Sequence, residues 1–144
     1  MAYTRDFTKD DDLFVGDDIA LVFEVFEDDL VVDDEGEYVS GTPIDVTAWT
    51  FLFVVRTTDT TPATAVLTKT TSAGITITGT FDANHTSNTQ RVVIAIPDTD
   101  TFSDLGSVLI APKPYRYSLK RTNAGSEKTV ARGKFVLQEV PARA

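Results

Sequence analysis

The chain contains one histidine, which lies in a polar loop beside two hydroxyl residues. His85 belongs to the stretch DANHTSNTQ at 82–90, next to Thr86 and Ser87. Histidine with serine and an acid is the residue set of a Ser–His–Asp hydrolase. A loop histidine is far more often solvated, and the sequence has no G-x-S-x-G elbow, P-loop or H-E-x-x-H motif. The residues therefore predict a protein that is not an enzyme and uses no cofactor.

Acidic residues are dense between residues 28 and 37, and carboxylate oxygens are ligands that calcium prefers. In an EF-hand loop with Gly36 at the sixth place, Val31 would take the first place and Thr42 the twelfth, so that template fails. Acid pairs also hydrolyse glycosides, but 22 acids in 144 residues form pairs by chance. The sequence predicts a solvated acidic turn here and leaves a structural calcium site as the alternative.

Charge is divided unevenly along the chain. Residues 1–45 carry 15 acids and two bases, a net charge of -13, whereas residues 46–144 carry 11 bases and 7 acids, a net charge of +4. Most of the positive charge lies between Lys113 and Lys134. Opposite patches of this kind either keep a protein soluble or meet in neighbouring copies or partners. The total of -9 argues against a nucleic-acid partner, because such proteins neutralise phosphates.

Length and composition are typical of one soluble domain. A chain of 144 residues can bury a substantial core, and the absence of cysteine favours a reducing place of synthesis. Residues 1–12 lack the apolar run of a signal peptide, and no segment approaches the ~18 consecutive apolar residues of a membrane span. We expect a polar arm over 1–15, one domain over 16–140 and a short tail over 141–144, with no membrane partner.

Apolar residues alternate with period two along most of the chain, which predicts β-strands. Polar turns separate the runs, and helix is nearly absent except for one turn near 98–105, where Phe102 and Leu105 share a side. About seven to eight short strands with polar turns predict an all-β, antiparallel sandwich. The alternating runs lie at 19–26, 49–56, 65–69, 75–78, 92–96, 115–121 and 130–138.

The stretch PIDVTAWTFLFVVR at 43–56 begins as a polar corner and continues as a strand. Pro43 fixes its own φ and pushes the preceding residue toward extended geometry, while Asp45 and Thr47 can accept hydrogen bonds from nearby backbone N–H groups. We interpret the corner as a device that directs Trp49 into the core. The residues predicted to form the core are Phe23, Trp49, Phe51, Phe53, Ile94, Tyr117 and Phe135.

An ordered set of short motifs runs from the first predicted strand to the last. It consists of Gly16-Asp17, Pro43-Ile44-Asp45-Val46-Thr47-Ala48-Trp49-Thr50, Phe53, Arg56, Val92, Ile94, Ile96, Pro97, Tyr115, Tyr117, Leu119, Gly133, Phe135, Val136 and Leu137. Over residues 16–140 this set resembles the N-terminal domain of the phage baseplate upper protein family. The resemblance implies an immunoglobulin-like β-sandwich that serves as a structural module of tailed-phage particles, with no catalytic residues.

Apolar residues occupy both faces of the long predicted strands, and this favours assembly. Together with the charge division and the resemblance, it predicts a non-enzymatic virion protein of the tail, connector or baseplate region, assembled in the host cytoplasm. Its partners are then other virion proteins and copies of itself. Capsid decoration or a fibre-base role is the alternative within that class. The interface candidates are Val22, Phe26, Asp28, Asp29, Asp33, Asp34, Leu52, Val54, Arg116, Lys120 and Arg121.

A second class of function, a carbohydrate-binding or receptor-binding sandwich module, rests on aromatic residues. Tyr38 ends a turn, whereas Tyr115 and Tyr117 alternate with Arg116 and are expected to face the core. The same basic and aromatic strand suits single-stranded nucleic acid, whose bases stack on rings, but the acidic total argues against that partner.

Overall fold

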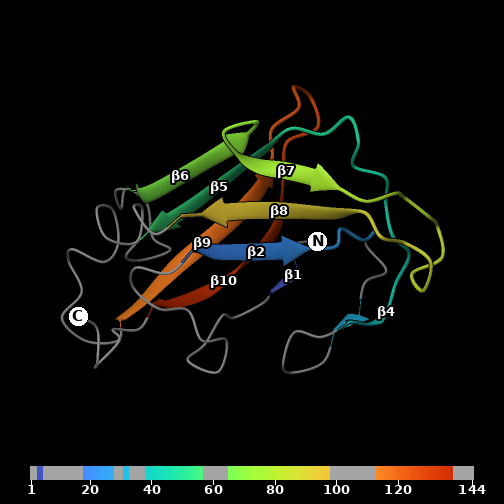
Figure 1. Ribbon diagram of the computed structural model, residues 1–144, viewed down its shortest axis with the longest axis horizontal. Helices are drawn as coiled ribbons and strands as arrows, with labels where there is room; N and C mark the ends of the chain where they lie inside the picture. Colours follow the sequence, from blue (N-terminus) through green and yellow to red (C-terminus); the bar gives the residue numbers. More distant parts are fainter. Residues whose placement is uncertain are drawn as a thin grey trace.

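The computed structural model describes residues 3–4, 18–27, 31–32, 38–56, 65–97 and 113–137, and within these ranges the chain is all-β (Figure 1). Each strand from β5 onward falls on one of the alternating runs. Two residues of the expected N-terminal arm form β1. The strands are β1 (Tyr3–Thr4), β2 (Ile19–Phe23), β3 (Val31–Val32), β4 (Tyr38–Ser40), β5 (Phe51–Arg56), β6 (Ala65–Thr71), β7 (Gly74–Thr78), β8 (Arg91–Ile96), β9 (Lys113–Arg121) and β10 (Lys128–Leu137).

Eight of these strands form one hydrogen-bonded sheet in the order β1-β10-β9-β5-β6-β7-β8-β2, and β3 and β4 form a separate pair. The sheet folds over into two layers, with β2, β8 and β7 in one and β10, β9, β5 and β6 in the other (Figure 1). This is the immunoglobulin-type order, with B, E and D strands in one layer and G, F, C and C′ strands in the other. The predicted all-β sandwich is confirmed, and the expected helical turn near 98–105 lies outside the described residues.

The sheet is mixed where the sequence predicted an antiparallel one: β1–β10 and β6–β7 pair in parallel, and the other pairs of the sheet are antiparallel. The β6–β7 contact is a tight corner that carries the chain from one layer to the other. Thr70 pairs with Gly74 and Thr71 with Ile75 across this corner. Ser72 has a φ of 67°, the left-handed region that non-glycine residues seldom adopt. The corner therefore shifts the chain sideways within two residues without reversing its direction, at a cost in backbone strain.

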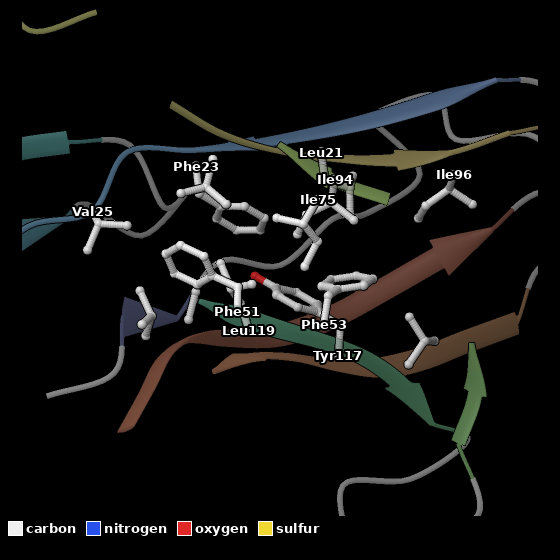
Figure 2. Packing of buried hydrophobic residues seen from close by; sticks show 14 of the residues in the cluster. Leu21, Phe23, Val25, Phe51, Phe53, Ile75, Ile94, Ile96, Tyr117 and Leu119 are labelled. Atoms are coloured by element: carbon white, nitrogen blue, oxygen red, sulfur yellow. The ribbon is translucent and has the colours of Figure 1, made fainter. Parts of the chain in front are cut away.

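The hydrophobic core lies between the two layers, and Figure 2 shows the side chains that meet there. Tyr117 joins the layers, because its ring centroid lies 6.0 Å from that of Phe23 on β2 and 5.7 Å from that of Phe53 on β5. Each large side chain buried in this way contributes about 1.5–3 kcal/mol. Phe135 of β10 pairs with Tyr115 of β9, and the side chain of Phe135 is outside the described set. The remaining predicted core residues are buried as expected: Phe23, Trp49, Phe51, Phe53, Ile94 and Tyr117.

Candidate functional surfaces

The polar corner before β5 is closed by a hydrogen-bond network. The Asp45 Oδ1 atom accepts bonds from the Thr47 backbone N–H at 3.0 Å and from the Thr47 hydroxyl at 2.6 Å. Buried Gln90 donates from Nε2 to Asp45 Oδ1 and to Thr47 Oγ1, each at 3.0 Å, and its Oε1 accepts the Val46 backbone N–H. Hydrogen bonds from Thr47 and Gln90 hold the pKa of the Asp45 carboxyl below its ordinary value. These hydrogen bonds fix the backbone conformation of the corner, whose role is therefore structural, as the sequence indicated.

A second amide holds the other side of the corner. Asn123 Oδ1, in the β9–β10 turn, accepts the backbone N–H of Thr50 at 2.9 Å and the Arg121 Nε–H at 3.0 Å. Its Nδ2 donates to the carbonyl of Ala48 at 3.2 Å. The Arg121 guanidinium lies 4.0 Å from the centroid of the Trp49 ring, an arrangement that gives a cation–π attraction. Arg121 thus covers the buried tryptophan and belongs to the core side of β9.

The loop with the only histidine is anchored to β2 by one carboxylate. His85 Nδ1 lies 3.0 Å from both oxygens of Glu24, and Asn88 Nδ2 donates to Glu24 Oε2 at 2.8 Å. Arg91 approaches Glu24 Oε1 at 3.4 Å, and the Glu24 side chain is 9% exposed. The His85 ring also contacts Phe26, with centroids 5.6 Å apart. His85 is thereby used to hold the loop, and none of the contacts described for it joins it to Ser87 or Thr86.

The outer side of the β10–β9–β5 layer is basic. Tyr115, Tyr117 and Leu119 are buried, so the alternate residues of β9 lie on the outer side. The strand register then places Arg116 directly opposite Arg56 of β5 and Lys134 of β10. Arg56 and Lys134 each make a further interaction within the chain. We call the following residues the basic face: Arg56, Arg116, Lys120, Arg132 and Lys134.

The middle of the outer side of the β2–β8 pair is apolar, and Arg91, which alternates with Val93 and Ala95 on β8, adds a charge at one end. Ala20 pairs with Ala95 and Val22 with Val93, so these four side chains form one patch, here called the apolar edge. Val22 is 50% exposed and is the one large apolar side chain described as exposed. β2 is also the last strand of the sheet, and no described strand pairs with its other side. Such an edge offers unpaired backbone groups to another chain.

Beyond β2, residues 25–27 run antiparallel to residues 42–44, with Phe26 bridged to Pro43. Ile44 N–H donates to the Val25 carbonyl at 3.0 Å, and Glu27 N–H donates to the Thr42 carbonyl at 2.8 Å. β3 then pairs antiparallel with β4, and Figure 1 shows β4 apart from the main sheet. The sequence puts seven acids and no base within residues 27–37, and of these acids Glu27 lies in the described residues.

The predicted interface residues do not share one surface. Val22 lies on the apolar edge, and Arg116 and Lys120 lie on the basic face. Val54 alternates with the core residues of β5 and so lies on the outer side of the strand, as expected. It is only 6% exposed, however, so it is buried within its own chain. Arg121 covers Trp49, Phe26 contacts His85, and Leu52 is half-buried. The side chains of Asp28, Asp29, Asp33 and Asp34 lie outside the described residues.

Two of the three tyrosines considered for sugar stacking are core residues, because Tyr115 and Tyr117 are 0% and 3% exposed. The side chain of Tyr38 is outside the described set, as is the acidic turn considered for calcium. Elsewhere in the described ranges, no group of three His, Cys, Asp or Glu side chains is arranged to hold a metal ion. No described helix is long and apolar enough to cross a membrane.

No protein-family model matches the chain, and no curated protein matches it significantly. The resemblance to the baseplate upper protein family therefore stays a prediction.

Proposed function

We propose that the chain is a non-enzymatic structural protein of a tailed-phage virion, acting as an assembly module in the tail, connector or baseplate region. The observation that carries the proposal is the apolar edge. Water solvates such a patch poorly, and an uncharged terminal strand readily accepts a further strand. In the particle this surface is covered by another virion protein. The choice of a tailed phage rests on the sequence resemblance.

A capsid-decoration or fibre-base role would use the same apolar edge as its contact surface. It differs only in where in the particle the chain lies. The carbohydrate-binding alternative has less support, because Tyr115 and Tyr117 are buried and cannot stack on a sugar ring.

The place in the particle is tested by immunogold electron microscopy of phage particles that are produced with an epitope-tagged chain. Label at the tail, connector or baseplate is expected. Label spread over the head supports the decoration alternative, and particles without any label overturn the proposal.

A matched pair of variants tests the apolar edge. Val22→Lys puts a charge into the patch and is expected to reduce incorporation into particles by at least about tenfold, because burying an unpaired charge is costly. Ala124→Lys adds the same charge at an exposed position in the β9–β10 turn and is expected to incorporate normally. Equal incorporation of both variants, with equal melting temperatures, contradicts the role of this surface.

A further inference from the structure

We propose that the two cations over the Trp49 ring, Arg121 and Lys128, form a binding site for a carboxylate of a partner protein. The site lies beside the β9–β10 turn, in the layer opposite the apolar edge. The inference goes beyond the proposed function and does not depend on it, because the site recognises an acidic side chain in any assembly.

Strand pairing brings the two cations together. Arg121 of β9 and Lys128 of β10 are register partners, and they are the pair nearest the β9–β10 turn. Side chains directly opposite each other in an antiparallel pair have Cβ atoms about 4.5–5.5 Å apart. Both side chains lie over the same indole ring, with the Arg121 Cζ atom 4.0 Å and the Lys128 Nζ atom 5.6 Å from its centroid. One anion can therefore contact both cations.

The Arg121 guanidinium is already oriented, yet most of its donors are unused. Its Nε–H donates to Asn123 Oδ1 at 3.0 Å, and the Trp49 ring lies against its Cζ atom. Within the described part of the chain, no acceptor bonds the Arg121 Nη atoms or the Lys128 Nζ atom, and neither side chain has an ion pair. A guanidinium binds a carboxylate through two parallel hydrogen bonds, and one that is held in place beforehand loses little freedom on binding.

The chemistry of the site suits a carboxylate better than a nucleic-acid strand. Proteins that bind nucleic acid neutralise a row of phosphates, and the net charge of -9 opposes such a polyanion. Binding of single strands also uses exposed aromatic rings on which bases stack, whereas Trp49 is 8% exposed and covered by the two cations. Two cations match the charge of one or two acidic side chains.

The test uses the full chain and a short acidic peptide. Trp49 is the chain's only tryptophan, so its emission reports events at the site. The probe is the peptide Gly-Glu-Glu-Gly with blocked ends, and the control peptide has glutamine in place of glutamate. Calorimetry at low salt measures affinity. The parent is expected to bind the acidic peptide with a saturable change in Trp49 emission, more weakly as salt rises, and not to bind the glutamine peptide.

Three variants locate the binding, and their melting temperatures show that each is folded. Lys128→Gln, at an exposed position, is expected to weaken binding about two- to fivefold, the size of one exposed ion pair. Arg121→Lys keeps the charge but not the two parallel hydrogen bonds, and is expected to weaken binding by about fivefold or more. Lys120→Gln is the matched control, because Lys120 is exposed, carries the same charge and lies on the outer side of β9. It is expected to bind the peptide as the parent does.

A parent that does not bind the acidic peptide overturns the proposal, whatever is found about the chain in particles. Equal affinities in Lys128→Gln and Lys120→Gln also overturn it, because the peptide then responds to the charge of the whole chain and not to this site. Retention of a single-stranded DNA oligonucleotide by the parent and its loss in Lys128→Gln, without binding of the peptide, overturns it as well and assigns the site to phosphate.

Discussion

Gln90 Nε2 donates a hydrogen bond to Asp45 Oδ1 across 3.0 Å and joins two loops that are 45 positions apart in the sequence. The same amide accepts the backbone N–H of Val46, so one side chain satisfies three polar groups of the corner before β5. Its position explains why a corner rich in polar groups can sit beside the core without losing stability.

The first prediction concerns this joint. Gln90→Ala removes the partner of the Val46 N–H and leaves polar groups near the core unsatisfied. We expect the free energy of unfolding to fall by about 2–3 kcal/mol. Urea denaturation measures the change, and Ser87→Ala, at an exposed position of the same loop, is expected to have almost no effect. A Gln90→Ala variant as stable as Ser87→Ala would contradict the role of the amide.

A second prediction follows from the lowered pKa of Asp45. A carboxyl whose folded pKa lies below its unfolded value stabilises the fold above the ordinary value of 3.8, and this contribution is lost as pH falls through the folded pKa. Asp45→Asn keeps an acceptor oxygen but cannot titrate. The parent should therefore melt at a higher temperature than Asp45→Asn at neutral pH, and the gap should narrow below pH 3.8. A gap that is constant from neutral to acidic pH would rule out this linkage.

A third prediction concerns Trp49. Trp49→Ala leaves a cavity beside Phe51 and is expected to cost about 3–5 kcal/mol. The contact with Arg121 is tested separately by a double-mutant cycle with Trp49→Leu and Arg121→Met. We expect a coupling energy of about 0.5–1 kcal/mol, the size of a cation–π contact. Additive effects of the two changes would show that the guanidinium contributes no attraction to the ring.

The strands and most of the core could be predicted from sequence, because alternation reports directly which residues face inward. The alternation predicts correctly that Tyr117 and Trp49 are buried. The same alternation puts Arg121 on the side of Tyr117, although the run of positive charge suggested a surface role. The structural roles of Gln90 and Asn123 could not be predicted from sequence. Both side chains bond residues of the corner at 45–50, which lie far away along the chain, and no local pattern indicates such a contact. By alternation Val54 lies on the outer side of β5, and it is nevertheless buried. Periodicity indicates the side of the strand on which a residue lies but not whether that side is covered.

The last prediction compares two glycines with almost the same backbone conformation. Gly79 has a φ of 76° and Gly125 a φ of 79°, so an L side chain is strained at either position. A Cβ atom on Gly79 would lie 2.0 Å from the Thr89 carbonyl oxygen, whereas nothing lies within 4 Å of one on Gly125. The two substitutions to alanine therefore share the conformational cost and differ in the clash.

Gly125→Ala is expected to cost about 1–2 kcal/mol, the penalty of left-handed backbone alone. Gly79→Ala should cost more, because Thr89 must move, and Thr89 bonds Thr80 through its N–H at 3.1 Å and accepts the Thr80 N–H at 2.9 Å through its hydroxyl. Loss of these bonds should loosen the base of the loop that holds His85. Hydrogen exchange at residues 80–89 checks this, and it should rise in Gly79→Ala but stay at the parent level in Gly125→Ala. Equal exchange and equal stability in the two variants would show that the loop adapts without the Thr80–Thr89 contact.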